Sequence, residues 1–200
     1  MDPETSKNVA EWFKKRYREI DRQMLPLSGT CNRGCDWCCY QSIEILNWEE
    51  PLIRHYVKNH LTNAQKANVR EKLVTWFDYF DSRMPVDQVL TSDEVFQRFQ
   101  QLQAHDRFPC IFLDDHECTI YEVRPLCCRM HVVDNGPLKC KEDPLTDSSP
   151  RAEKIRKLFL SSITERVPTY LQLLNYSMAS LFKLNDRIRP VNFPLLKGVI

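Results

Sequence analysis

The 200-residue chain is 42% hydrophobic and 28% charged, with a formal net charge of +1. This composition is typical of a soluble globular protein, and the length favours one domain, here taken as residues 1–200. The near-zero charge and the lack of a basic block exclude a general electrostatic attraction to nucleic acid or to an acidic membrane surface. We therefore expect no nucleic-acid partner and no membrane partner.

Capping signals and hydrophobic periodicity predict helices in the first half of the chain. Residues 7–24 place apolar side chains on one face at helical spacing. Asn47, Thr62 and Thr91 are each followed three residues later by Glu or Gln, which is the pattern of a capping box at a helix start. The second of these helices should end near residue 84 and the third near residue 104. A short strand is expected at 40–46, where apolar and polar residues alternate.

The second half is predicted to contain a hairpin, a loop and two further helices. Two short apolar runs within 108–125 flank an acidic turn, which indicates a β-hairpin whose second strand ends at Pro125. Residues 134–149 have the composition of a loop. Ser149-Pro150 predicts a helix start, because proline is favoured in the first turn. That helix should reach about residue 166, and another is expected at 169–184.

Cysteine usage is the unusual feature of the sequence. The nine cysteines fall into two groups separated by a long cysteine-free stretch. The first group is Cys31, Cys35, Cys38 and Cys39, and the second is Cys110, Cys118, Cys127, Cys128 and Cys140. Two sequence-distant groups of this kind are typical of a metal site built from two halves. We therefore expect a mostly α-helical domain whose one or two small β-hairpins carry a cysteine metal site.

Disulfides and inert buried thiols are the alternatives to a metal site. The N-terminal sequence shows neither an apolar signal core nor a membrane-spanning run, so we expect a cytoplasmic protein. A reducing cytoplasm and an odd number of cysteines argue against structural disulfides. Buried inert thiols would suit one or two cysteines, with Cys127 the first candidate. They do not explain four cysteines within nine residues beside Gly34, whose conformational freedom suits a tight ligand loop.

The cysteine thiolates fit a soft metal, which is either zinc or the iron of an iron–sulfur cluster. Four thiolates satisfy one tetrahedral zinc ion or one [4Fe–4S] cluster. Eight or nine cysteines indicate either more than one metal or one cluster with additional thiols. The spacing C-x3-C-x2-C and this excess of thiols favour an iron–sulfur cluster over zinc.

The two cysteine groups resemble those of a known family. The pattern C-x3-C-x2-C-C, followed by F-P-C-x7-C-x2-Y-x2-R-P-x2-C, is similar to the YkgJ-type cysteine-cluster family of zinc- or iron-chelating domains. The matching residues are Cys31, Cys35, Cys38, Cys39, Pro109, Cys110, Cys118, Tyr121, Arg124, Pro125 and Cys128, with Cys140 matching a further downstream cysteine. The resemblance implies a bound metal held by the eight cysteines of this set. It covers residues 28–142, interrupted by a helical insertion at about 47–104, and leaves 1–27 and 150–200 as flanking helices.

The resemblance also gives roles to two polar residues near the cysteines. Tyr121 and Arg124 lie inside the second motif, where a hydroxyl and a guanidinium would donate hydrogen bonds to thiolate or sulfide sulfur. The alternative is a tyrosine packed on the hairpin and an arginine in a surface ion pair. His131 is a further possible nitrogen ligand, and His116 is expected to be solvated at the hairpin turn.

Two weaker resemblances bear on S-adenosylmethionine. A related cysteine cluster occurs in flagellin lysine N-methylases, which are linked to this cofactor. The segment CNRGCDWC also resembles the cluster loop of radical S-adenosylmethionine enzymes, although the regular strand–helix alternation of their barrel is missing. S-adenosylmethionine is therefore a possible cofactor, while the reaction and any catalytic residue remain open.

Three classes of function follow from these patterns. The first is a metal-binding protein that acts in metal handling, in redox sensing or as an accessory to another protein. The second is an enzyme that modifies a protein or peptide with S-adenosylmethionine. The third is a structural zinc module that presents its helices to a partner. In each class we expect a protein or peptide partner.

Overall fold

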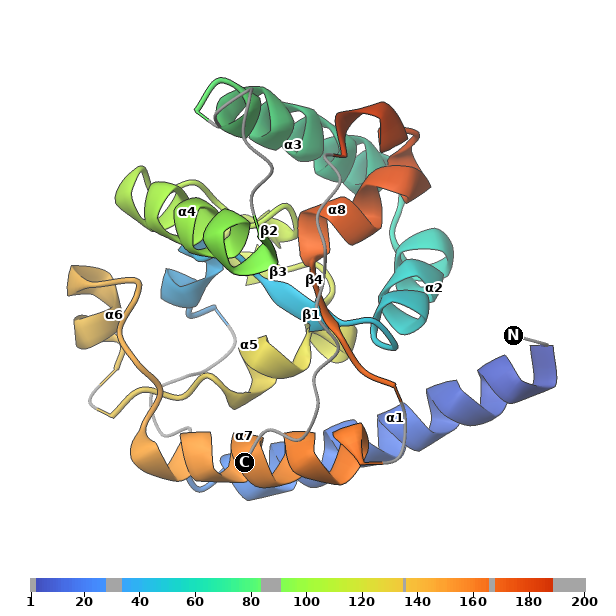
Figure 1. Ribbon diagram of the computed structural model, residues 1–200, viewed down its shortest axis with the longest axis vertical. Coiled ribbons are helices and arrows are strands. Elements are labelled where there is room, and N and C mark those ends of the chain that lie inside the picture. The colour runs from blue at the N-terminus through green and yellow to red at the C-terminus, as the bar shows by residue number, and fades with distance from the viewer. Residues whose placement is uncertain (1–2, 28–33, 84–90, 135, 166–167, 189–200) are drawn as a thin grey trace.

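The computed structural model describes residues 3–27, 34–83, 91–134, 136–165 and 168–188. It is mostly helical, as the sequence predicts, and the elements are arranged around a small central region of strands (Figure 1). The helices are α1 (Pro3–Met24), α2 (Glu50–His60), α3 (Asn63–Asp81), α4 (Ser92–His105), α5 (Leu126–Met130), α6 (Leu138–Glu142), α7 (Pro150–Thr164) and α8 (Leu174–Ala179). The strands are β1 (Glu44–Leu46), β2 (Leu113–Asp114), β3 (Glu117–Cys118) and β4 (Leu171–Leu173).

The strands form two antiparallel pairs. β2 and β3 make the predicted hairpin, with Leu113 opposite Cys118 and Asp114 opposite Glu117. β1 pairs instead with β4, so that Ile45 lies opposite Gln172 although the two are far apart in the sequence. The second pair therefore closes the fold by joining the cysteine-bearing part of the chain to its C-terminal part.

Helix starts follow the capping chemistry of the sequence. Thr62 accepts a hydrogen bond from the Gln65 amide while the Gln65 side chain accepts one from the Thr62 amide. Thr91 and Glu94 form the same reciprocal pair at α4. Ser149 caps α7 by accepting from the Ala152 amide. These local bonds satisfy amide groups that have no partner inside the helix, which is why the three predicted starts are confirmed.

The capping box predicted at Asn47 is wrong. α2 begins at Glu50, with Glu49 at its cap position and Pro51 in its first turn. The Asn47 side chain instead accepts a hydrogen bond from the Tyr170 amide at 3.1 Å and donates one to the Pro168 carbonyl at 3.3 Å. The approach of β4 to β1 gives Asn47 distant partners, and these replace the local cap.

Four other predicted elements differ from the structure in extent or type. The strand expected at 40–46 is extended only over β1, since the 3-10 turn Trp37–Tyr40 precedes it. The second hairpin strand ends at Cys118, and a 3-10 turn at Tyr121–Val123 then leads into α5. The expected loop at 134–149 contains α6, and the helix expected at 169–184 begins as β4 and continues as the shorter α8.

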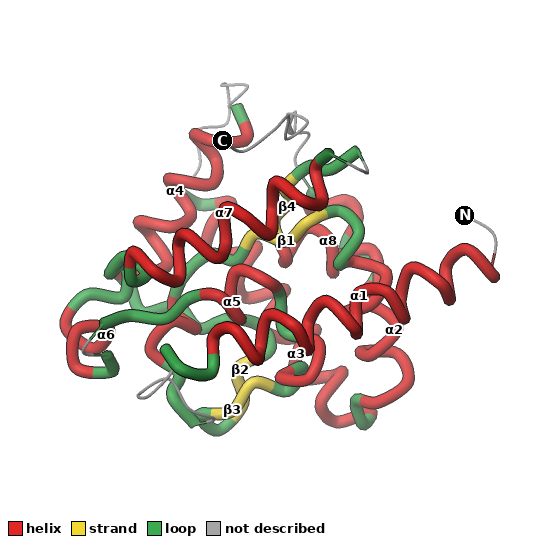
Figure 2. The backbone as a smooth tube through the Cα atoms, turned by 90° about the horizontal axis from the view of Figure 1, so that it is seen from below, coloured by secondary structure: helices red, strands yellow, loops and turns green. Residues whose placement is uncertain are grey.

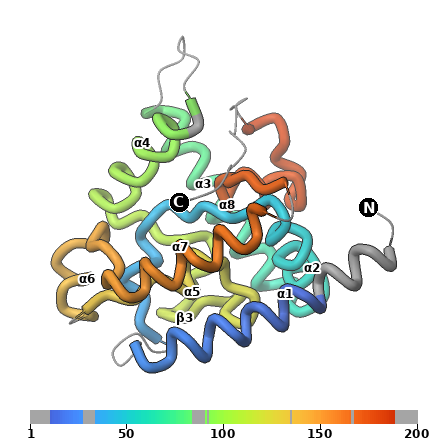
Figure 3. The backbone as a smooth tube through the Cα atoms, turned by 60° about the horizontal axis from the view of Figure 1, so that its bottom comes forward, coloured from blue at the N-terminus to red at the C-terminus, as the bar shows by residue number. Residues whose placement is uncertain are grey.

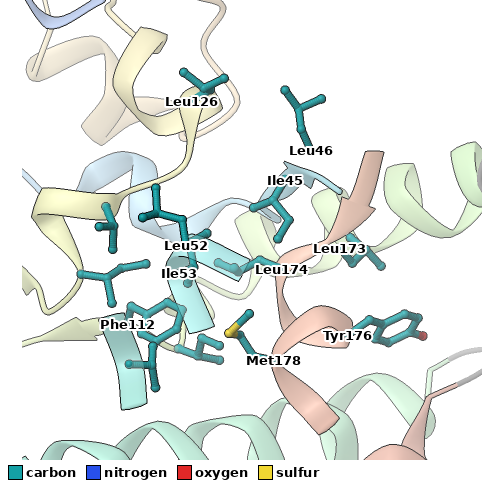
Figure 4. Packing of buried hydrophobic residues seen from close by; sticks show 14 of the residues in the cluster. Ile45, Leu46, Leu52, Ile53, Phe112, Leu126, Leu173, Leu174, Tyr176 and Met178 are labelled. Carbon is teal, nitrogen blue, oxygen red and sulfur yellow. The ribbon is translucent and has the colours of Figure 1, made fainter. Parts of the chain in front are cut away.

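Aromatic side chains from α3, α4 and α8 build the centre of the hydrophobic core. Trp76 packs edge-to-face on Phe99 at 5.0 Å between ring centroids and on Tyr176 at 5.9 Å. Around β1 and β4, residues such as Ile45, Leu173 and Met178 continue this core (Figure 4). Each fully buried side chain of this size contributes about 1.5–3 kcal/mol through removal of apolar surface from water.

Helix α5 is held between α1 and α7, which both contact it (Figures 2 and 3). The buried face of α1 consists of Phe13, Tyr17, Ile20 and Met24, and it is the face that the periodicity of residues 7–24 predicts. The short helix that carries Cys127 and Cys128 is therefore fixed from two sides. Within the described residues, no helix combines the length and the apolar character needed to cross a membrane.

Candidate metal centre

Thiol side chains from distant parts of the chain line one cavity of about 90 Å³. We call it the thiol cavity. Its cysteines come from the turn before β1, from the hairpin, from α5 and from α6: Cys35, Cys38, Cys39, Cys110, Cys118, Cys128 and Cys140. Cys31, the remaining member of the predicted set, lies outside the described residues.

Backbone geometry brings the two cysteine groups together. Gly34 has a φ of +90°, a conformation that side-chain-bearing residues rarely adopt, and this allows the tight turn before Cys35. The 3-10 turn Trp37–Tyr40 then places Cys38 and Cys39 on the cavity wall. The Cys110 amide donates a hydrogen bond to the Cys39 carbonyl at 2.6 Å. The first and second motifs are thus joined through the main chain.

A side-chain contact joins the same two segments a second time. His116, at the tip of the β2–β3 hairpin, lies with its Nδ1 2.8 Å from Asp36 Oδ2. The Asp36 side chain is only 10% exposed, whereas that of His116 is 76% exposed. The hydrogen bond and the charge of Asp36 raise the pKa of His116. The predicted exposure of His116 is confirmed, but its ring also contacts the wall of the thiol cavity.

The adjacent cysteines of α5 lie in different environments. Cys128 lines the thiol cavity, whereas Cys127 lines a second cavity beside it. The Cys127 thiol donates a hydrogen bond to the Glu44 carbonyl at 3.1 Å, and its sulfur is 3.9 Å from that of Cys128. Cys127 is half-buried rather than part of the hydrophobic core. The family resemblance and the structure therefore both set it apart from the other cysteines.

The thiols of the cavity perturb one another's ionisation. A hydrogen bond with Cys38 and then burial raise the pKa of Cys39, and the same bond lowers the pKa of Cys38. Burial, followed by the charge of Cys128, raises the pKa of Cys118 to about 12. Burial also raises the pKa of Cys110, with Cys118 adding to the effect. Several thiolates in this space repel each other, and a bound cation is what offsets such repulsion.

Tyr121 and Arg124 both line the thiol cavity, where the sequence motif predicts them. The Arg124 guanidinium carbon lies 4.2 Å from the centroid of the Tyr121 ring. The Arg124 Nε is buried and has no hydrogen-bond partner among the described residues. The positive charge of Arg124 also lowers the pKa of Cys38. Both side chains are thus placed to interact with a group held by the thiols, which stays a prediction.

The chemistry of this donor set suits a thiophilic metal or an iron–sulfur cluster, because most of its donors are cysteine sulfurs. In the described part of the chain, no three Cys, His, Asp or Glu side chains already stand in the arrangement that holds one metal ion. The thiols therefore line a common cavity without forming a finished coordination sphere.

A buried polar network next to the centre was not predicted from the sequence. Glu49 is 1% exposed and accepts hydrogen bonds from the Tyr17 hydroxyl at 2.7 Å and from the Leu46 and Leu126 amides at 2.8 Å each. Arg129 forms two hydrogen bonds with Asp21, at 2.7 and 2.9 Å. In sequence, Glu49 looks like an ordinary acidic residue at a helix start. Its buried hydrogen bonds are made with α1 and α5, and no local sequence pattern predicts that these helices contact Glu49.

Comparison with known proteins agrees with the geometry of the site. The mostly helical fold and the cavity shared by both cysteine groups are those of a cysteine-cluster domain. The chain belongs to the CxxCxxCC family, described as "Putative zinc- or iron-chelating domain", whose model matches residues 30–149. The resemblance drawn from the cysteine motifs is thereby confirmed. Searches of curated proteins and of solved structures gave no match.

Proposed function

We propose that the thiol cavity holds an iron–sulfur cluster of the [4Fe–4S] type and that the protein acts in metal handling, in redox sensing or as an accessory to another protein. The observation that carries the proposal is the set of seven cysteines lining a single cavity. In the sensing or accessory role the protein would work through a protein or peptide partner in the cytoplasm.

The number of thiols and the space between them favour a cluster over a single zinc ion. A tetrahedral zinc site needs four ligands, whereas this cavity offers seven described thiols and Cys31 belongs to the same motif. The cavity of about 90 Å³ is about three times the volume that one water molecule occupies in the liquid. It therefore has room for a group of several atoms.

The candidate ligands are the motif cysteines Cys31, Cys35, Cys38, Cys39, Cys110, Cys118, Cys128 and Cys140. A cluster bound by four of them would supply one-electron redox chemistry at a potential that its surroundings set. The chain itself contributes the positive charge of Arg124 and the neighbouring Tyr121 hydroxyl. Both would offset the negative charge that thiolates and sulfide bring into the cavity.

Metal content and an absorption spectrum of protein purified without oxygen test this proposal. The expected result is iron with acid-labile sulfide and a broad visible absorption from sulfur-to-iron charge transfer. Zinc with no colour would overturn the cluster and favour the structural zinc module. Saturable binding of S-adenosylmethionine would favour the protein-modifying enzyme instead.

Adjacent cysteines give a matched pair of variants for the same measurement. Cys128→Ser changes a thiol inside the cavity, while Cys127→Ser makes the same chemical change one residue away and outside it. We expect Cys128→Ser to lower the iron content at least several-fold and Cys127→Ser to leave it within error. Equal loss in both variants would contradict the assignment of Cys128 as a ligand. Circular dichroism would show whether each variant keeps its helices.

A further inference from the structure

A second cavity of about 480 Å³ adjoins the thiol cavity. We call it the side cavity. Four residues line both cavities and so form a shared wall: Cys38, Ile43, Cys128 and His131. Its volume falls within the range of about 300–1,000 Å³ that is typical of small-molecule sites. A molecule in the side cavity would therefore lie directly against the thiols of the proposed centre.

The lining of the side cavity carries more negative than positive charge. Its carboxylates are Glu44, Asp147 and Glu153, and its guanidinium is that of Arg156. Glu153 and Arg156 are 3.6 Å apart and offset each other. Burial and the nearby Arg156 lower the pKa of His131, so its ring is uncharged at neutral pH. Asp147 and the ionised form of Glu44 are left as the excess charge, which favours a cation.

One buried polar group in this lining lacks a hydrogen-bond partner among the described residues. The Nε2 atom of His131 is screened from solvent and has no hydrogen-bond partner among the described residues, while Nδ1 lies 3.0 Å from the Ser148 hydroxyl. The Glu44 carboxylate lines the same cavity and is half-buried, and burial raises its pKa. Buried polar groups normally have partners, so the unpartnered His131 nitrogen is informative. A polar ligand would supply the partner that His131 Nε2 lacks, and its N–H groups would donate to the Glu44 carboxylate.

We propose that the side cavity binds a small organic ammonium ion, with its charged nitrogen on Glu44 and its remaining atoms against the wall shared with the thiol cavity. This goes beyond the proposed function, because it adds a ligand site that the metal centre alone does not require. The shared wall means that the ligand would contact Cys38 and Cys128 from the side opposite the centre. Binding there would couple an amine to the state of the centre.

Calorimetry with the full chain as purified tests the charge preference. The probe is 1,4-diaminobutane at pH 8, where Glu44, with its pKa raised by burial to about 7, is mostly ionised. Butane-1,4-diol and succinate are the neutral and anionic controls of similar length. We expect saturable binding of the diamine and at least tenfold weaker binding of either control. Equal affinity for the diamine and the diol, or no diamine binding up to about 10 mM, would overturn the proposal.

Substitutions of cavity carboxylates test whether the diamine binds in the side cavity. Glu44→Gln should weaken diamine binding at least tenfold, because it removes the negative charge that assists the hydrogen bond with the ammonium group. Glu71→Gln makes the same change on the exposed face of α3 and should have no effect. If Glu44→Gln fails to fold, Asp147→Asn serves in its place, since Asp147 is exposed at the edge of the cavity. Unchanged affinity in both cavity variants would show that the diamine binds elsewhere.

The thiol of Cys127 gives an independent measure of occupancy, because it lines the side cavity and not the thiol cavity. The diamine should slow alkylation of Cys127 by iodoacetamide at least threefold, as followed by peptide mass spectrometry. An unchanged rate at saturating diamine would contradict binding in this cavity. Iron and sulfide content are measured on the same samples, so a failure of amine binding is distinguishable from a failure of the proposed cluster.

Discussion

The charge balance of the thiol cavity depends on Arg124. The hydrogen bond with Cys39 lowers the pKa of Cys38, and the Arg124 guanidinium adds to this effect. At Cys118 and Cys128 the same guanidinium opposes the burial and thiol contacts that raise the pKa. Arg124→Gln removes this charge while keeping a shorter polar side chain. We expect the affinity of the centre for its metal to fall about 10–100-fold, the usual effect of losing a residue that supports the ligands.

Competition with a chelator measures the effect of Arg124→Gln. Arg83→Gln is the matched control, because Arg83 also stacks on a tyrosine, with its guanidinium carbon 3.9 Å from the Tyr79 ring centroid, but lies away from the thiols. Arg124→Gln should lose its metal to the chelator more readily than Arg83→Gln, while the helix content of the two variants stays the same. Equal retention would mean that Arg124 only packs on Tyr121.

Glu44 should make the stability of the fold depend on pH. Burial, then Asp93, raises its pKa to about 7, with Arg156 acting in the opposite direction. A folded-state pKa above the unfolded value of 4.5 gives stabilisation that is complete below pH 4.5 and is lost as the pH rises through about 7. Asp147, Glu153 and His131 line the same cavity as Glu44.

Glu44→Gln removes this titration. We expect the free energy of unfolding of the variant, relative to the unmodified chain, to rise by about 1–2 kcal/mol between pH 5 and pH 8, after allowance for solvent screening. Urea unfolding at intervals across that range gives the two curves. Parallel curves would show that Glu44 keeps its ordinary pKa in the folded protein.

The joint between α1, α2 and α5 depends on one buried carboxylate. Glu49 accepts from Tyr17 on α1 and from the Leu126 amide at the start of α5, so its removal leaves buried donors without an acceptor. Glu49→Ala should lower the free energy of unfolding by about 3–5 kcal/mol, which is the cost of breaking a buried charged network. Tyr17→Phe removes only one neutral donor and should cost about 1 kcal/mol. Similar losses in both variants, measured by urea unfolding, would contradict a central role for Glu49.

Element boundaries were predictable where local chemistry decides them. The starts at Thr62, Thr91 and Ser149 are confirmed because each cap bonds within four residues. β4 was predicted as helix, because its pairing with β1 is a contact between residues more than a hundred positions apart. The cap predicted at Asn47 was wrong for the same reason, since the side chain bonds to Tyr170, which is also more than a hundred positions away. Single-sequence patterns contain no signal for such pairings.

At the scale of the whole molecule, cysteines of both predicted groups line a common cavity, whereas the sequence held no signal for what surrounds them. Residue type and spacing single out the two groups, and seven described members line one cavity. The Asp36–His116 contact, the Glu49 network and the side cavity arise only when separate elements pack together. The division between Cys127 and Cys128 follows from the direction of α5, which α1 and α7 fix from either side.

Removal of the metal should loosen one part of the molecule selectively. The thiol cavity is the place where the turn before β1, the hairpin, α5 and α6 meet, and the proposed group would cross-link them. Metal binding in small cysteine modules contributes about 10–16 kcal/mol, which is comparable with the stability of a whole domain. By contrast, α3 is held by the aromatic core around Trp76, none of whose rings lines the thiol cavity.

Amide hydrogen exchange before and after chelation tests this division. We expect exchange in the β2–β3 hairpin and in α5 to accelerate roughly tenfold or more on metal removal, while the amides of α3 change less than about twofold. The Cys127→Ser variant should show the same pattern, because it leaves the thiol cavity intact. Uniform acceleration would mean that the centre stabilises the fold as a single cooperative unit. No acceleration would mean that the packing of α1 and α7 on α5 holds the cavity without the metal, so that the group serves chemistry rather than folding.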